Sequence, residues 1–547
     1  MNENLKKRAR ESRTAIEKIY VNMRHLFNRG SYKPNGISGS SLRSNLIQLN
    51  PEIYGSISDP EKVELDGLLY VIDRLPRGIE ECRFIKLIAQ EGYEKSSFEA
   101  LIPPKRRRNC YRIDDNSMYI EMTRGRSDVY DILTHLTFIY VEADKIRNHA
   151  LDSKNQPSQD WQKLSRVVKL EEAGEPFDQN KALTYLSNVL GRTFEETKEA
   201  VLKFEAGKNG NSLYHIGYWL GQIAIDELNN SGDREISIST KLRDHIGHHI
   251  YGDRWAQAIK QSLEDQGLLN HKVHIISANL HSVLNTLYGK AALPKSKSSS
   301  LDDLAQQTSQ SNNKALQEKI KKFALKNGLV ELTDTAGTNL IVQIIDISKI
   351  PGLKTKHKTV VIVMDYAFGE QAFECMDELL KPYEKEDQEL KLDVQSISIM
   401  GKAGILQGDK GDIMIPTSHV FEGTTDNYPF KNEFTKKDFE GFGLKVFEGS
   451  MITVLGTSLQ NRDILQYFKN STWNAIGIEM EGVHYQKAIQ AASLIRRSIP
   501  ENVKVMYAYY ASDNPLITGK TLASGSLGPE GVKPTYLITQ KILEKIL

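Results

Sequence analysis

Hydrophobic residues in the first half of the chain recur every three or four positions, the spacing of one face of a helix. The clearest such stretch runs from Leu5 to Phe27. A second runs from Ser127 to His149, and its first residues, Ser127 and Asp128, favour a helix N-terminus. Further helices are predicted at 180–190, 193–204, 212–228 and 255–266. We therefore expect residues 1–290 to form a mainly helical N-terminal domain.

The middle of the chain breaks this pattern. Residues 294–313 are polar, rich in Ser and Gln, and offer almost no apolar surface to bury, which predicts a linker. A short charged helix is expected at Lys314–Lys326. These segments assign residues 291–336 to a connection between two domains.

From residue 337 onward, compact runs of β-branched and other apolar residues replace the helical spacing. Such runs, alternating with helices, are typical of a mostly parallel sheet covered on both faces. The predicted strands are 340–345, 359–364, 394–400, 412–415, 451–455, 475–478 and 503–508. The predicted helices between them are 370–380, 461–468 and 482–496. We expect residues 337–547 to form an α/β domain with a mixed, mostly parallel sheet flanked by helices.

Composition narrows the class of protein. Hydrophobic residues make up 39% and charged residues 26% of the 547 residues, ordinary values that exclude a wholly disordered or fibrous chain. The net charge of +1 does not indicate a general surface for polyanions. Cys82, Cys110 and Cys375 lie far apart, which argues against disulfides and a cysteine zinc site. No apolar run approaches the roughly 18 residues of a membrane span, and the N-terminus lacks a signal peptide, so we expect a soluble cytoplasmic protein.

Polar side chains and glycines follow several of the predicted strands. These segments are 365–370, 401–404, 479–482 and 512–515. In open α/β sheets, ligands bind outside the carboxyl ends of the strands. The segments combine one cation, Lys402, with several carboxylates and glycines. The sequence therefore predicts a site for a small polar ligand at this edge of the sheet.

Three of these segments also carry a family resemblance. GKAGILQGDKGDIMIPT (Gly401–Thr417), GIEMEG (Gly477–Gly482) and ASDNPL (Ala511–Leu516) occur in this order. They resemble the signatures of the purine nucleoside phosphorylase/nucleosidase superfamily, and the resemblance covers residues 337–547. The SDNPL continuation and the large N-terminal domain are most similar to bacterial AMP nucleosidases. The resemblance implies that superfamily's fold and cleavage of an N-glycosidic bond.

The resemblance also implies roles for individual residues. Asp513 matches the aspartate that protonates, or hydrogen-bonds, the purine N7. Glu481 matches the glutamate that holds the ribose hydroxyls, and Met480 the methionine beside the sugar. Ser458–Gln460 matches a segment that lines the base pocket. Other candidate substrate-binding residues are Glu479, Ser512, Gly401, Lys402, Ala403, Gly404, Gly369, Glu370, Leu459 and Gln460.

Some of these residues also have alternative interpretations, several of them purely structural. An Asp before Asn-Pro commonly forms a turn, as Asp513 could. Glu479 and Glu481 could form a charged strand-to-helix junction. Lys402 stands where the superfamily usually has Ser, Thr, Cys or His, so it is either a ligand for a substrate phosphate or a solvated loop residue.

One departure concerns the residue that activates water. In the superfamily, the first strand and its loop supply a glutamate that positions water in nucleosidases, or an arginine that binds phosphate in phosphorylases. The first strand is expected at 340–345, and neither residue follows it clearly. Glu370 could take this place, or could be a first-turn acid stabilised by the helix dipole.

The N-terminal half carries weaker chemical signals. Two groups have spacings that suit metal ligation but no defined set of ligands, so we expect no metal. They are Asp131, His135, Glu142 and His149, and His245, His248 and His249. A set of basic residues could bind an anionic effector, whereas nucleic acid is not expected. This set is Lys105, Arg106, Arg107, Arg108, Arg112, Arg124 and Arg126.

The expected activity is cleavage of a purine nucleotide or nucleoside, with hydrolysis of AMP to adenine and ribose 5-phosphate as first choice. Hydrolysis is favoured because phosphorylases hold phosphate with arginines, and only Arg462, Arg496 and Arg497 follow Gly337. The alternatives are a nucleotide-binding sensor without turnover and a true nucleoside phosphorylase. We expect no cofactor, a homo-oligomer, and an N-terminal domain that regulates or assembles the catalytic one.

Overall fold

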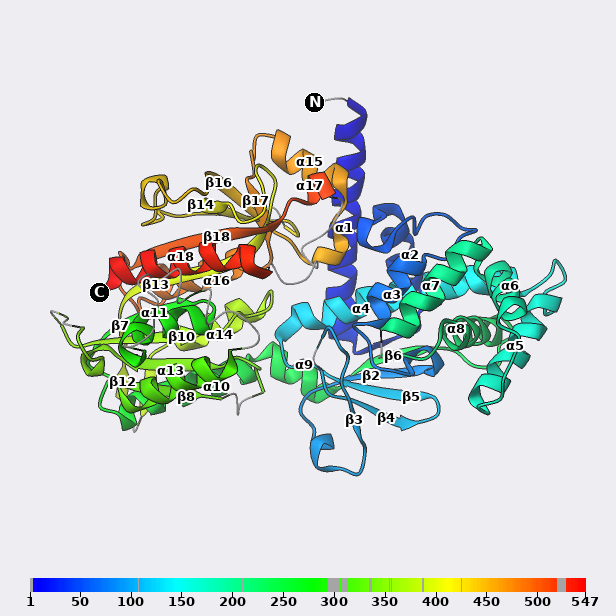
Figure 1. The fold of residues 1–547 in the computed structure, drawn as a ribbon, viewed down its shortest axis with the longest axis horizontal. Coiled ribbons are helices and arrows are strands. Elements are labelled where there is room, and N and C mark those ends of the chain that lie inside the picture. The colour runs from blue at the N-terminus through cyan, green and yellow to red at the C-terminus, as the bar shows by residue number, and fades with distance from the viewer. Residues whose placement is uncertain are drawn as a thin grey trace.

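The computed structural model describes residues 3–106, 108–207, 210–293, 305, 313–333, 337–353, 355, 357–385, 388–424, 426–518 and 528–547. Most of the predicted linker, 294–304 and 306–312, lies outside these residues. Figure 1 shows two units side by side, each with its own sheet and helices. Among the described helices, none is both long and apolar enough to cross a membrane.

The helices of the N-terminal unit that the hydrophobic spacing predicted are α1 (Glu3–Arg29), α4 (Gly125–Ala150), α6 (Gln179–Leu190), α7 (Phe194–Ala206) and α8 (Leu213–Leu228). The unit also contains helices that were not predicted, namely α2 (Ile37–Leu49), α3 (Leu65–Ile72), α5 (Gln159–Glu172) and α9 (Thr240–Gly247). The helix expected at 255–266 packs against the sheet of the C-terminal unit instead. Helix α1 lies along the boundary between the units (Figure 1), where the Arg8 guanidinium pairs with Asp463 at 3.1 Å. The large apolar core of this unit continues across the boundary to Ile452 and Ile464.

This unit also contains a six-stranded sheet that the sequence did not predict. Its order is β1 (Ser31–Tyr32), β6 (Glu235–Ile238), β2 (Phe84–Ile88), β5 (Ser117–Glu121), β4 (Cys110–Asp114) and β3 (Ala100–Leu101). The strands are two to five residues long and are spread over more than 200 residues of sequence. Strands β1 and β3 have two residues each, and β2, β4, β5 and β6 have four or five, which is at or just above the shortest run in which alternation can be recognised. The N-terminal unit is therefore less purely helical than expected.

The C-terminal unit is built on a ten-stranded sheet. Its order is β15-β14-β16-β17-β13-β7-β10-β9-β8, and β18 pairs with β13 and β14. The strands are β7 (Lys272–Ser277), β8 (Leu329–Leu332), β9 (Val342–Asp346), β10 (Thr359–Met364), β13 (Asp393–Ile405), β14 (Ile413–Phe421), β15 (Asn427–Pro429), β16 (Val446–Thr453), β17 (Gly477–Glu479) and β18 (Lys504–Asp513). A separate hairpin joins β11 (Tyr383–Lys385) and β12 (Gln388–Leu390). Successive pairings of β14, β16, β17, β13 and β18 close into a ring.

Helices cover both faces of this sheet, as predicted for the α/β unit. One apolar cluster joins the sheet to α10 (Ile250–Asp265), α14 (Gln371–Leu379) and α16 (Gly482–Gln490). Another joins it to α11 (Leu280–Ala292), α13 (Lys314–Lys326) and α18 (Val532–Ile546). The remaining helices of this unit are α15 (Arg462–Asn470) and α17 (Pro515–Thr518). Within β7, Val273 and Ile275 belong to the first cluster and Ile276 to the second, so this strand is buried on both faces.

The position of β7 corrects two expectations. It pairs in parallel with both β10 and β13, so a central strand comes from residues 272–277, within the stretch assigned to the N-terminal domain. The C-terminal sheet therefore cannot be separated from the rest of the chain at residue 291. The strand expected to come first, now β9, is antiparallel to β10. Both errors have one cause, since a short buried strand shows neither its partners nor its direction in its sequence pattern.

Candidate active site

A cavity of about 410 Å³ lies where the two units meet the strand ends of the larger sheet. The C-terminal unit lines it with Ser277, Tyr366, Ala367, Phe368, Ile399, Met400, Gly401, Lys402, Thr457, Glu479, Met480, Glu481, Tyr485 and Tyr509. The N-terminal unit contributes Arg74, Lys105 and Arg106. The structure thus brings Gly401, Lys402 and the Glu479–Glu481 segment together, as the sequence predicted.

The Gly401–Gly404 segment is strand, not the loop that the sequence predicted. Strand β13 runs on to Ile405, and a register shift between Ala403 and Gly404 lets it follow β18. Small residues allow this close pairing, because a Cβ on Gly401 would lie 3.2 Å from the Tyr509 ring. Lys402 therefore projects from a paired strand at the edge of the cavity.

Glu481 is held at the start of helix α16 by the loop that follows β10. The backbone N–H of Gly369 donates to Glu481 Oε1 at 2.9 Å. Gly369 has a φ of +55°, a left-handed conformation that favours glycine. Burial raises the pKa of Glu481 to about 7, while Arg106 and Lys402 act to lower it. Glu481 thus lines the cavity together with cations from both units.

Glu479 holds the backbone around Glu481 through hydrogen bonds. Its carboxylate accepts hydrogen bonds from the Thr453 hydroxyl and from the backbone N–H groups of Glu481 (2.6 Å) and Gly482. Burial and the neighbouring Glu481 raise the pKa of Glu479 to about 8. Only glycine fits at position 482, because a Cβ there would lie 2.2 Å from the His419 ring. Glu479 thus fixes the backbone at the start of α16, next to Glu481.

Asp513 lies beyond the lining of the cavity, at the end of β18. It is 8% exposed and pairs in register with Gly404, two residues after Lys402. The Ser512 hydroxyl lies 2.6 Å from Asp513 Oδ1 and 3.1 Å from the carbonyl oxygen of Ala403. Asp513 Oδ2 is buried and has no hydrogen-bond partner among the described residues. Burial raises the pKa of Asp513, against the influence of Lys402.

The other predicted site residues outside the cavity lining are Gly369, Ala403, Gly404 and Ser512, which lie close to lining residues in sequence, and Glu370, Leu459 and Gln460. Glu370 faces a second cavity of about 320 Å³ and pairs with Arg126 at 3.2 Å. The Gln460 amide donates to both carboxylate oxygens of Glu422, and Leu459 is buried in the core. The predicted base-pocket segment therefore reaches the cavity only through the preceding residue, Thr457.

The N-terminal unit brings part of its basic run to the site. Arg106 Nε donates to Asp131 Oδ2 at 3.2 Å, and the guanidinium lies 4.9 Å from the centre of the Phe368 ring. Arg108 is buried between Asp128 (2.7 Å) and Asp131 (2.9 Å). Asp128 is therefore an ion-pair partner and not a helix cap, because α4 begins two residues before Ser127. The Ser127 hydroxyl instead accepts from the backbone N–H of Glu370 at 2.9 Å, which ties the two units together.

The helical-face group proposed as a metal candidate is dispersed among protein partners. The Tyr54 hydroxyl lies 2.9 Å from His135 Nδ1, Glu142 pairs with Lys145 at 2.9 Å, and His149 contacts the carbonyl oxygen of Glu61. In the second group, His248 is exposed beside Asp244. These side chains are used in packing and ion pairing.

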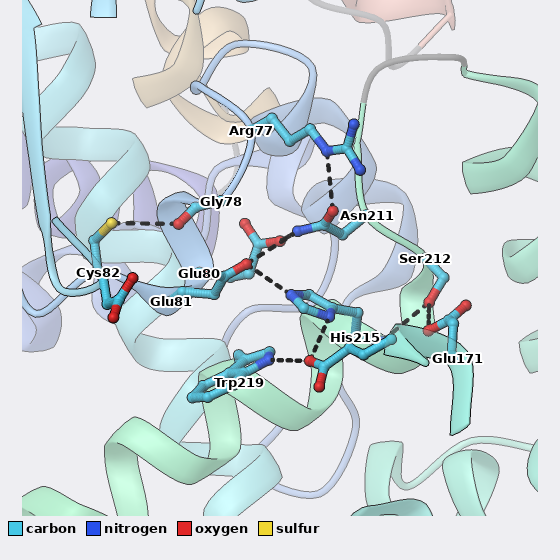
Figure 2. Close-up of polar contacts among 12 residues, drawn as sticks. Arg77, Gly78, Glu80, Glu81, Cys82, Glu171, Asn211, Ser212, His215 and Trp219 are labelled. Carbon is cyan, nitrogen blue, oxygen red and sulfur yellow. Dashed lines mark hydrogen bonds and ion pairs between the residues drawn. The ribbon is translucent and has the colours of Figure 1, made fainter. Parts of the chain in front are cut away.

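Two other groups in the described part of the chain bring potential metal-ligating atoms within 4.8 Å of one another. They are Glu80, Glu81 and His215, and His249, Asp377 and Glu378. Figure 2 shows the first group, in which His215 Nε2 lies 2.8 Å from Glu81 and the Asn211 amide donates to Glu80 at 2.6 Å. In the second, Arg496 pairs with Asp377 and Lys381 with Glu378, both at 2.7 Å. Protein groups already occupy these side chains.

Sequence reasoning missed several lining residues. Ser277, whose hydroxyl lies 2.9 Å from that of Tyr485, was missed because β7 was not recognised. Lys105 and Arg106 were noted as a basic run, but nothing local to them indicates the other unit's cavity. Arg74 is an isolated arginine with no signal of its own.

We compared the chain with known families, curated proteins and solved structures. Residues 40–322 and 300–547 match the model of DUF6909, described as a family of unknown function. No curated protein matches the chain. Among solved structures, the 5′-methylthioadenosine/S-adenosyl homocysteine nucleosidase of Campylobacter jejuni is 12% identical, covering 50% of this chain and 98% of its own, with a TM-score of 0.31.

Two further solved structures show the same level of similarity. A futalosine hydrolase mutant from Helicobacter pylori is 11% identical, over 50% of this chain and 100% of its own, with a TM-score of 0.31. A uridine phosphorylase from Schistosoma mansoni, in complex with thymidine, is 10% identical, over 50% of this chain and 86% of its own, with a TM-score of 0.31. At these values, the reaction has to follow from the site itself.

Proposed function

The chain belongs to DUF6909, a family of unknown function, and from the chemistry of its cavity we propose that it cleaves the N-glycosidic bond of a purine nucleotide or nucleoside. The first choice of reaction is hydrolysis of AMP to adenine and ribose 5-phosphate. The observation that carries the proposal is the Glu481 carboxyl group, fixed at the strand ends and facing a cavity large enough for a small ligand.

Breaking this bond develops positive charge on the ribosyl ring and negative charge on the base. In the proposal, the Glu481 carboxylate accepts hydrogen bonds from the ribose hydroxyls and stabilises the positive charge as it forms. The backbone N–H of Gly369 and the fixed turn at Glu479 hold the carboxylate before substrate binds. Such preorganisation lowers the barrier because no further reorientation is needed.

Asp513 is the proposed general acid for the base. A ribose at Glu481 would let the purine extend along β13 toward Gly404, which pairs in register with Asp513. In its protonated form, the Asp513 carboxyl group can donate to the purine N7 as the C1′–N9 bond breaks, and burial raises the pKa of this group. The oxygen of a water molecule then bonds to C1′, and the proton that this water loses leaves with solvent.

The structure weakens the sequence argument for water, rather than phosphate, as the nucleophile. The sequence argument for hydrolysis counted only arginines after Gly337, whereas the structure adds Arg74 and Arg106 to the cavity. Strand β7, which comes first along the chain among the strands of the larger sheet, and the start of α11 contain neither glutamate nor arginine over 272–283. The residue that orients the nucleophile is therefore not supplied by this segment.

The test is to incubate the full-length protein with a panel of purine nucleotides and nucleosides, with and without inorganic phosphate. Free base and sugar products are resolved by chromatography. We expect adenine and ribose 5-phosphate from AMP without added phosphate. A strict requirement for phosphate, with ribose 1-phosphate as product, would show a phosphorylase. Tight binding without release of base would show a sensor.

We also propose that the working form is a homo-oligomer and that the N-terminal unit supports catalysis. The second part is favoured by the three lining residues and by the contact between Ser127 and Glu370, which join this unit directly to the site.

A further inference from the structure

We propose that Arg74, Lys105 and Arg106, here called the basic wall, form a subsite of the cavity that binds a phosphate group. The basic wall comes wholly from the N-terminal unit and faces the same cavity as Glu481. The inference rests on the proposed function and deepens it, because it names the chemical class of the substrate or co-substrate.

The charge on the lining favours an anionic ligand. Four cations line the cavity, the basic wall and Lys402, against two carboxyl groups, those of Glu479 and Glu481. Glu479 is already occupied by three donors at the start of α16. The cavity therefore presents more positive than negative charge to a bound molecule, in surroundings that screen charge less than water does.

Two members of the basic wall have donor groups without acceptors. Arg74 is 8% exposed, with its guanidinium 3.4 Å from the centre of the Tyr70 ring and Nη1 donating to the Tyr70 carbonyl at 2.7 Å. Its buried Nε has no hydrogen-bond partner among the described residues. Arg106 uses Nε for Asp131, and in the described part of the chain no acceptor engages its terminal nitrogens. A guanidinium fork of this kind matches the oxygens of a phosphate.

The basic wall is also held in place before a ligand binds. Asp131 orients Arg106, and Arg108 shares that carboxylate at 2.9 Å. The backbone N–H of Lys105 donates to the carbonyl of Asp73 at 3.0 Å, next to Arg74. Arg106 lies over Phe368, and the next residue, Gly369, binds Glu481. A phosphate at the basic wall is thus near the ribose proposed at Glu481.

This chemistry fits two sources of phosphate, and the same assay distinguishes them. One is the 5′-phosphate of a nucleotide such as AMP. The other is free inorganic phosphate acting as nucleophile on a nucleoside. In both cases the basic wall neutralises the anion, but only the first requires the phosphate to be part of the substrate.

The experiment uses full-length Arg106→Gln and Arg74→Gln, with Arg77→Gln as the matched control. Arg77 is an exposed arginine whose Nε donates to Asn211 at 3.0 Å, away from the cavity. We measure kcat/KM for AMP and for adenosine, each with and without inorganic phosphate. We also measure the rise in Tm caused by ribose 5-phosphate and by ribose, a readout that needs no turnover.

If the basic wall binds the 5′-phosphate of AMP, kcat/KM for AMP should fall by roughly 10–100-fold in Arg106→Gln and in Arg74→Gln. This is the effect expected when a hydrogen bond to a charged group is lost. Adenosine turnover without phosphate changes by less than about threefold, and the Tm rise with ribose 5-phosphate is lost. A loss confined to adenosine with inorganic phosphate supports the subsite but assigns it to a co-substrate. Equal losses on AMP and on adenosine without phosphate, or an undiminished Tm rise, overturn the subsite.

Failure of the subsite and failure of the proposed function give different results. If the wild type releases no base but ribose 5-phosphate raises its Tm, and the variants lose this rise, the subsite stands and the nucleosidase proposal fails. If the variants keep full turnover both of AMP and of adenosine with inorganic phosphate, the subsite fails and the nucleosidase stands. Arg106→Lys keeps the charge and should recover part of the loss. The Tm without ligand checks folding, which Arg108 should protect by keeping Asp131 paired.

Discussion

Two groups of titratable side chains in this molecule differ in how fully their polar atoms are used. Around Glu80, Glu81 and His215, each side chain has a polar or charged partner (Figure 2). Arg112 adds an ion pair to Glu81 at 2.8 Å. By contrast, Arg74 Nε on the cavity wall and Asp513 Oδ2, at the end of β18 beyond the lining, are buried and have no hydrogen-bond partner in the part of the chain that the structure describes. Unpaired buried polar atoms cost stability, and an atom of this kind on a cavity wall can gain a partner from a bound ligand. Both groups contain charged and buried side chains, and they differ in whether the buried polar atoms have hydrogen-bond partners.

Substituting one acid from each group should give the largest difference between them. Asp513→Asn keeps the shape but cannot supply the proton, so kcat should fall by roughly 10²–10⁴-fold while ligand binding survives. Glu80→Gln is the control, and it should lower Tm without changing kcat. Both are measured by release of free adenine and by thermal unfolding. If Asp513→Asn were as active as the wild type, Asp513 would have no part in the mechanism.

Glu481→Gln tests the second cavity acid. The amide is nearly the same size but carries no charge to stabilise the ribosyl cation, so kcat/KM should fall by roughly 10²–10³-fold. Steady-state kinetics with AMP measures this. The matched control is Glu81→Gln, which removes a carboxylate of the other group and should leave kcat/KM unchanged. A loss below about threefold in Glu481→Gln would show that the negative charge of Glu481 does not contribute to catalysis.

Lys402→Met separates a phosphate ligand from a lysine that only balances charge. If Lys402 binds phosphate together with the basic wall, kcat/KM for AMP should fall by roughly 10–100-fold and adenosine should be little affected. Parallel assays on the two substrates measure this. An equal loss on both substrates would show that Lys402 only balances the charge of Glu481 and Asp513.

The pKa of Glu481, raised to about 7 by burial, predicts opposite pH trends for activity and stability. Since the ionised form is the active one, kcat/KM should fall about tenfold per pH unit below 7, and Glu481→Gln should lose this limb. The folded state binds this proton more tightly than the unfolded state does, so the stabilising contribution of this group falls as pH rises from about 4.5 to 7. The decline of Tm over that range should therefore be shallower in Glu481→Gln. An unchanged acid limb in the variant would assign it to another group.

The sequence predicted local elements better than their partners. Strand β10 lies at the predicted Thr359–Met364 and α13 at Lys314–Lys326, because each has a compact apolar run or a clear helical period. Strand β7 was missed, since its role depends on pairing with strands that are more than 80 residues away in sequence.

The same distinction applies to the site residues, which were predicted where the signal is local and missed where it depends on packing. Glu481 and Lys402 were found because their motifs are local, and the structure places both at one cavity. Arg74 and Arg106 were not placed there, because their position depends on how two units pack. The Gly401–Gly404 segment was taken for a loop, since glycines in a sequence do not show that a neighbour such as Tyr509 has come close.

The most direct test of the central claim follows adenine release over time from AMP in phosphate-free buffer, using the wild type and Asp513→Asn side by side. We expect the wild type to form adenine and ribose 5-phosphate in equal amounts, and the variant to be slower by at least about 10²-fold. Absence of adenine from the wild-type reaction, under conditions where AMP binds, would contradict the proposal that this cavity cleaves the N-glycosidic bond.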